Sequence, residues 1–222
     1  MEGWALSHLA VNAAYGMKFD EARRLAAQAR QRFEVAGHQN GVGFVTFGEA
    51  DLEMVAESHR LGSLSAGDAQ QLLVRLEPML EVARTVGERN NLGHALETAG
   101  TAAVMAHRYA DAAGLMADAV DAFDTLGNQG CLTHCLDRVA WLADETVRSE
   151  DAVRLLAASQ SLREHVGMAA PPILARVHDQ VRDSAAARLS TRCFETAWRE
   201  GTAMDREAAV VFALKLARSV GS

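Results

Sequence analysis

Apolar residues recur three and four positions apart along most of the chain, which is the spacing of one face of an α-helix. Four segments with this spacing each end at a glycine, over 20–37, 70–87, 109–127 and 150–167. A glycine just after the last apolar position is a common helix end, because glycine enters left-handed backbone without strain. The pattern therefore predicts four amphipathic helices with defined C-terminal ends.

The closing glycines also share a register. Gly37, Gly87, Gly127 and Gly167 are separated by 50, 40 and 40 residues, and a second helical segment precedes each of the four, at roughly 2–16, 41–59, 91–107 and 130–146. We therefore expect an all-α chain of about four helix–turn–helix units. Their expected bounds are about 1–37, 38–87, 88–127 and 128–168, followed by C-terminal capping helices over 169–222.

Small residues on the first helix of a unit allow the second helix to pack closely. The third unit carries this pattern best, with Leu96, Ala99, Gly100 and Ala103 followed by Ala112, Met116 and Ala119. The first unit repeats it with Leu6, Leu9, Ala10, Ala13, Ala22, Ala26 and Ala29, and the fourth with Leu136, Val139, Ala140, Ala143, Ala152 and Leu156. This pattern resembles the tetratricopeptide repeat, which implies an α-solenoid. The alternative is an alanine-rich helical bundle without a true repeat.

The second unit departs from the pattern in three places. Thr46 and Glu49 stand where apolar residues are expected, and ten extra residues separate its two helices. Ser65 and Asp68 match a capping box, so a new helix should begin there, and Pro78 should kink or split that helix. Near the end of the chain, Thr202 and Asp205 match a second capping box.

The last third of the chain resembles the C-terminal helical region of actinobacterial LuxR-type and adenylate-cyclase-like multidomain ATPase regulators of transcription. The resemblance rests on an "A..LL.AA..LRE..G....P" helix and an "F..AW..G" ending. The matching residues are Ala152, Leu155, Leu156, Ala157, Ala158, Leu162, Arg163, Glu164, Gly167, Pro171, Phe194, Ala197, Trp198, Gly201, Glu207, Ala208, Ala209 and Val210. It implies a sensor or interaction module that controls an attached ATPase and DNA-binding output, with this chain as a fragment. The alternative is a free-standing adaptor.

Composition narrows the choice of partner and compartment. The net charge of −7 and the absence of a Lys/Arg-rich segment argue against direct nucleic-acid binding. No apolar run approaches the length that spans a bilayer, and the first residues lack the pattern of a signal peptide. Three cysteines without framework spacing fit a reducing compartment, so we expect a cytoplasmic protein.

No catalytic motif is present in the sequence. It contains no GxxxxGK[ST] loop, no GxSxG elbow and no HExxH pair, and its only lysines are Lys18 and Lys215. The acidic residues fall at helix starts and on solvent-facing positions. We therefore interpret the chain as non-enzymatic, without a cofactor or metal, and keep a purely structural spacer as the plainest alternative.

One position of each first helix carries a ring. These positions are Trp4, Phe44, His94 and His134. First helices line the concave wall of such solenoids, so we expect a groove for a protein or peptide partner, or for other domains of a larger regulator. The candidates along it are Trp4, Phe44, Phe47, His94, Glu97, Thr101, His134, Asp137 and Trp141. A ring-lined acidic groove suits apolar and basic groups. The competing interpretation is that the rings pack against the adjacent unit.

The stretch CLTHC places Cys131, His134 and Cys135 about one helical turn apart. The repeat register explains each residue separately, since Cys135 falls on a small packing position and His134 on the ring position. Two thiols and one imidazole fall short of a four-ligand zinc site, unless His94 supplies the fourth ligand. A response of His94 and His134 to pH or metal stays open at this point.

Overall fold

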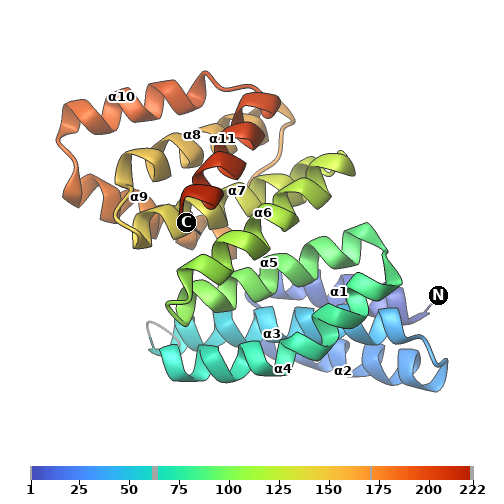
Figure 1. Ribbon diagram of the computed structural model, residues 1–222. Helices are drawn as coiled ribbons and strands as arrows, with labels where there is room; N and C mark the ends of the chain where they lie inside the picture. Colours follow the sequence, from blue (N-terminus) through green and yellow to red (C-terminus); the bar gives the residue numbers. More distant parts are fainter. Residues whose placement is uncertain (1, 62–64, 171, 221–222) are drawn as a thin grey trace. The chain divides into compact units, whose positions relative to one another are not determined.

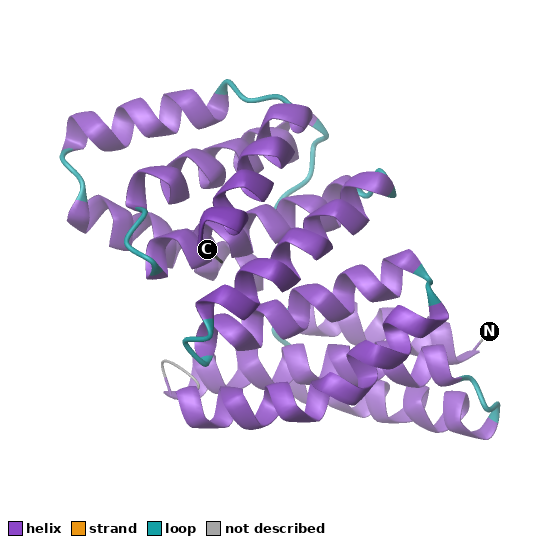
Figure 2. Cartoon of the chain, viewed as in Figure 1, coloured by secondary structure: helices purple, strands orange, loops and turns teal. Residues whose placement is uncertain are grey.

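The computed structural model describes residues 2–61, 65–170 and 172–220, and this part of the chain forms eleven helices and no strand (Figures 1 and 2). The all-α prediction is therefore confirmed. The helices are α1 Glu2–Tyr15, α2 Phe19–Val35, α3 Gln39–Leu61, α4 Ala66–Val86, α5 Arg89–Met105, α6 Tyr109–Thr125, α7 Gln129–Glu145, α8 Ser149–His165, α9 Pro172–Arg188, α10 Thr191–Thr202 and α11 Arg206–Val220.

The predicted helix ends are confirmed at all four glycines. Gly37, Gly87, Gly127 and Gly167 have φ angles of 64°, 70°, 65° and 67°. After Gly127, the amide of Asn128 donates to the carbonyl of Phe123 at 3.0 Å, which closes α6 with a Schellman-type hydrogen bond. The amide of Met168 closes α8 in the same way on Arg163, at 2.9 Å.

The same turn occurs at three positions without glycine. Met17, His107 and Val147 have φ angles of 59°, 58° and 60°. The amide of Arg148, next to Val147, donates to the carbonyl of Ala143 at 2.8 Å. These turns lie between the two helices of a predicted helix–turn–helix unit. The glycine register did not predict them, because the left-handed residue there carries a side chain.

The structure tests three predicted local features: the Ser65 cap, the effect of Pro78 on its helix, and the second capping box. Ser65 caps α4 as expected, since the amide of Asp68 donates to its Oγ at 3.1 Å. Of the two outcomes predicted for Pro78, the split is wrong, because α4 continues from Ala66 to Val86 across it, and the kink stays a prediction. At the second capping box, Thr202 is the last residue of α10, and Asp205 alone caps α11 by accepting from the amide of Ala208 at 2.8 Å.

Contacts divide the chain into two compact units. The first holds Met1–His107 with Pro171–Ile173, and the second holds Arg108–Ala170 with Leu174–Ser222. This division differs in kind from the predicted boundary between 1–168 and 169–222, which stays a prediction about repeats and cap. In the first unit each helix packs on the next along the chain, and α3 also contacts α1 and α5 (Figure 1).

The small-residue face of α1 and α2 is buried as the pattern predicted. Ala10, Ala26 and Ala29 form a core cluster with Phe33 of α2 and Val45 of α3, where alanines let the helix axes approach. Leu9 is the exception, with 52% of its surface exposed. It occupies the position of the buried Ala99 on α5, so the same repeat position is covered on one first helix and exposed on another.

Contacts with α2 explain why Thr46 and Glu49 occupy positions where apolar residues were expected. Arg30 of α2 donates to Thr46 Oγ1 at 3.1 Å and forms an ion pair with Glu49, both on α3. Thr46 and Glu49 therefore replace apolar contacts with a polar bridge between neighbouring helices.

In the second unit, α7 and α8 form the central pair. The predicted inner-face residues Leu136, Val139, Ala140, Ala143, Ala152 and Leu156 are all fully buried. Helix α10 packs on α8, and α11 packs on α6, α7 and α8. The crossing of α10 and α8 is close: a Cβ at Gly201 would lie 2.0 Å from the carbonyl oxygen of Arg154. The contact therefore requires a residue without a Cβ atom, which is glycine.

Candidate functional site

The first unit brings three of the predicted ring residues together. Trp4 of α1 lies 5.5 Å from Phe44 of α3, and Phe44 lies 6.0 Å from His94 of α5, measured between ring centroids. All three side chains are half-buried. Equivalent positions on three successive first helices therefore form one continuous set of rings, which we call the ring array: Trp4, Phe44 and His94.

The ring array also packs against its neighbours. Trp4 contacts Phe33 at 5.0 Å and His38 at 5.7 Å, and His8 lies 6.2 Å from Phe44. Phe33 is buried, so Trp4 covers the core with one part of its ring system. Packing and partial exposure coexist at these positions, and aromatic rings attract cations through the negative potential of their faces.

The neighbours of the array on the first helices divide into two kinds. Phe47 and Thr101 are buried, and the Thr101 hydroxyl donates to the carbonyl of Glu97 at 2.9 Å. Both side chains therefore belong to the packed interior and are not open to a partner. The Glu97 carboxylate lies 3.8 Å from the Nδ1 atom of His94 and is partly exposed, so it adds a negative charge beside the array.

The remaining candidates lie on α7, in the second unit. His134 and Asp137 are buried, and Trp141 is partly exposed, with its indole N–H donating to Glu145 at 3.0 Å. Because His94 belongs to the first unit and His134 to the second, the ring array is defined only for Trp4, Phe44 and His94.

The residues of CLTHC have separate local roles. The amide of Cys131 donates to the side chain of Asn128, which caps α7, at 3.2 Å, and Cys135 is buried in the helix packing. The three cysteines form no disulfide. Among residues 2–61, 65–170 and 172–220, no three His, Cys, Asp or Glu side chains are arranged to hold a metal ion.

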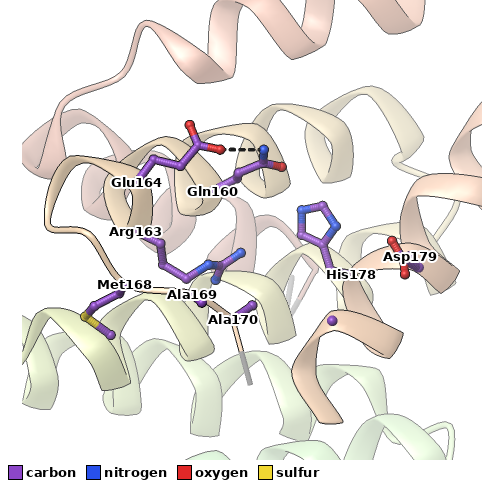
Figure 3. Close-up of a pocket in the computed structure, with 9 residues that line it drawn as sticks. Gln160, Arg163, Glu164, Met168, Ala169, Ala170, His178 and Asp179 are labelled. Carbon is purple, nitrogen blue, oxygen red and sulfur yellow. Dashed lines mark hydrogen bonds between the residues drawn. The ribbon is translucent and has the colours of Figure 1, made fainter. Parts of the chain in front are cut away.

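A cavity that sequence reasoning missed lies in the second unit, between α8 and α9 (Figure 3). Its volume is about 270 Å³. Two helices and the turn between them line it, with Gln160, Arg163, Glu164, Met168, Ala169, Ala170, Ala175, His178 and Asp179. The polar residues of α8 stand at i, i+3 and i+4, a spacing that places them on one face. The sequence contains no signal that α9 turns His178 and Asp179 toward the same space.

A buried ion pair forms one wall of this cavity. The guanidinium of Arg163 donates to Asp137 Oδ2 at 2.7 Å and to Ser159 Oγ at 2.8 Å. Asp137 is 1% exposed and Arg163 is 4% exposed. Ser159 in turn donates to the carbonyl of Thr133 at 2.9 Å, so the network joins α8 to α7. Asp137, expected in a groove, is therefore committed to Arg163 inside the unit.

His178 is the other buried polar group of the cavity. It is 9% exposed, its ring packs edge-on against Trp198 at 6.2 Å, and its Nε2 atom makes no hydrogen bond to the described residues. Burial lowers the pKa of His178 below its ordinary value of 6.5, while Asp137 acts to raise it and Arg163 to lower it further. The imidazole is therefore neutral at pH 7.

No family model, curated protein or solved structure matches this chain. Within the described helices, none is both long and apolar enough to cross a membrane.

Proposed function

We propose that this chain is a non-catalytic helical-repeat module that binds a protein or peptide partner through the ring array. The observation that carries the proposal is the continuity of Trp4, Phe44 and His94, which contact one another from three successive first helices and stay half-buried. Aromatic residues that are packed on one side and partly exposed are typical anchors of protein interfaces.

The charge around the array indicates the chemistry of the partner. Glu97 lies beside His94, and the chain as a whole carries a net charge of −7. A partner segment with apolar side chains between the rings and Lys or Arg side chains over them gains apolar burial, cation–π contacts and electrostatic attraction together.

The resemblance of the tail to LuxR-type regulators supports a more specific version of the proposal. In that version, the module is the regulatory arm of a multidomain ATPase that controls transcription, and its partner is another domain of the same protein or a signalling peptide. Sequencing the complete gene tests it. A phosphate-binding loop and a helix-turn-helix in the same reading frame support the regulatory arm, and a frame without them leaves a free-standing adaptor.

A selection from a peptide library tests the binding function. We expect enriched sequences that combine apolar residues with Lys or Arg, and affinity at least about tenfold lower for Phe44→Ala and His94→Ala. Val74→Ala is the matched control, because Val74 is an exposed apolar side chain on α4 outside the array. Circular dichroism checks that each variant folds. Unchanged affinity in both array variants contradicts the proposed surface.

A further inference from the structure

We propose that one face of α1 docks an amphipathic helix of a partner protein, with the same apolar pattern that the chain itself uses on α4 and α6. The face consists of Ala5, Leu9 and Asn12, which stand at i, i+4 and i+7 and are all exposed; we call it the α1 face. Trp4 lies on a different side of the same helix, because successive helical residues point about 100° apart. The inference therefore does not rest on the ring array.

An ion pair in the first unit identifies which helix covers this face elsewhere in the chain. Leu9 and Glu49 of α3 have the same place in the predicted repeat, forty residues apart. Glu49 forms an ion pair with Arg30 of α2, and α2 directly precedes α3 along the chain. The position of Leu9 is therefore one that, on a later first helix, meets the second helix of the preceding pair.

The equivalent faces of the later first helices are packed. Helix α2 packs on α3, α4 packs on α5, and α6 packs on α7. Apart from the ion-paired Glu49, the residues equivalent to the α1 face are all buried: Val45 and Leu52 on α3, Ala95, Ala99 and Ala102 on α5, and Cys135, Val139 and Leu142 on α7. This surface is thus closed on three first helices and open on α1.

The second helices indicate the chemistry of the partner. Arg30 stands seven residues before its closing glycine, and the residues at the same place are Leu80 on α4 and Val120 on α6, both buried. Each belongs to a buried apolar stripe at i, i+4, i+8 and i+11: Leu72, Leu76, Leu80 and Ala83 on α4, and Ala112, Met116, Val120 and Phe123 on α6. Arg30 interrupts this stripe on α2, where it meets Glu49. Leu9 offers no charge, so a helix that docks on α1 carries an apolar residue at this place, because a buried unpaired guanidinium is costly.

Burial of Leu9 provides the main attraction. Its side chain is the largest apolar group of the α1 face and is 52% exposed, so a docked helix removes apolar surface from water. Ala5 is small and lets the axis of a second helix approach, as the alanines between α1 and α2 do.

The test is a fluorescence-anisotropy titration of the full chain against a labelled peptide with the sequence of residues 65–86, which carries the α4 stripe and its Ser65 cap. We expect a Kd of about 0.1 mM or tighter, and at least about tenfold weaker binding to Leu9→Glu, because docking would bury an unpaired carboxylate. Val211→Glu is the matched control, since Val211 is an exposed apolar side chain on α11, and it should leave the affinity unchanged. Circular dichroism checks that both variants fold.

A charge exchange separates this docking from general apolar attraction. A peptide with Leu80→Arg reproduces what α2 presents to Glu49, so it should bind the Leu9→Glu variant at least about fivefold more tightly than the wild type. Equal affinity of the parent peptide for wild type and Leu9→Glu would overturn the proposal, and so would a Leu80→Arg peptide without this preference.

Sedimentation equilibrium of the chain alone tests the competing occupant. A dimer that Leu9→Glu dissociates would assign the α1 face to a second copy of the chain and would overturn the partner helix, whereas a monomer supports it. Phe44→Ala should leave the helix titration unchanged, so failure of the α1 face and failure of the ring array are separate results.

Discussion

The buried pair of Asp137 and Arg163 gives the sharpest test of the packing described here. Asp137→Asn keeps the shape of the side chain and removes its charge, so Arg163 is left charged and buried without its counter-ion. The two groups are 2.7 Å apart, and their side chains are 1% and 5% exposed, so solvent screens neither of them. The variant should destabilise the second unit, in which α7 and α8 form the central pair.

The magnitude follows from the burial. Removing one partner of a buried ion pair costs about 3–5 kcal/mol, because an uncompensated charge remains inside the protein. The asparagine oxygen and Ser159 Oγ still accept from Arg163, which places the expected loss near the lower end, at about 3 kcal/mol. The double variant Asp137→Leu/Arg163→Met removes both charges and should recover most of this loss.

Urea unfolding followed by tryptophan fluorescence measures the effect. In a Trp4→Phe background, the remaining tryptophans, Trp141 and Trp198, both report on the second unit. Asp183→Asn serves as the control, because the Arg182–Asp183 pair is exposed and its loss should cost less than about 0.5 kcal/mol. A loss below about 1 kcal/mol for Asp137→Asn, or a double variant no more stable than the single one, would refute the reasoning.

Three further substitutions test the turns, the helix crossing and the buried histidine. Val147→Gly should stabilise the chain by about 0.5–1 kcal/mol in thermal unfolding, since a β-branched residue at φ 60° is strained and its side chain is 77% exposed. Gly201→Ala should destabilise by about 2 kcal/mol or more in the same assay, because its Cβ meets the backbone of Arg154. The wild type should lose stability as the pH falls below 6.5, and His178→Phe should show a weaker pH dependence. Burial lowers the folded pKa of His178, so the unfolded chain takes up the proton first, with Asp137, Arg163, Asp179 and Arg182 as the surrounding charges.

Local sequence signals were sufficient for the helices but not for everything between them. Gly37 and its three equivalents marked helix ends, because a left-handed residue without a side chain is easy to recognise. Val147 adopts the same left-handed conformation, but a valine in the sequence does not indicate a helix end. Leu9 followed the apolar pattern of α1 and is nevertheless exposed, because periodicity defines a face and tertiary packing decides whether that face is covered.

The two candidate sites also differ in how far the sequence could predict them. The repeat register placed Trp4, Phe44 and His94 at equivalent positions, and equivalent positions on successive helices are neighbours, so their contacts were predictable. The cavity depends on the orientation of α9 relative to α8. His178 lies in a segment where no repeat relates it to Arg163, and no spacing rule links the two residues.

One position in the predicted repeat distinguishes the fourth predicted unit, which lines the cavity, from the other three. The residues four before each closing glycine are Phe33, Ala83, Phe123 and Arg163, and all four are buried. Phenylalanine fills this position with carbon in the first and third units. In the fourth unit, arginine requires a counter-ion and an acceptor, which Asp137 and Ser159 supply. Asp137 stands where Glu97 lies partly exposed beside His94 in the third unit. Where the first and third predicted units have a buried phenylalanine, the fourth has Arg163, which is part of the cavity wall. Its counter-ion Asp137 is buried, whereas the equivalent Glu97 is partly exposed. Restoring carbon at this position in the double variant therefore tests stability and the polar character of the cavity together.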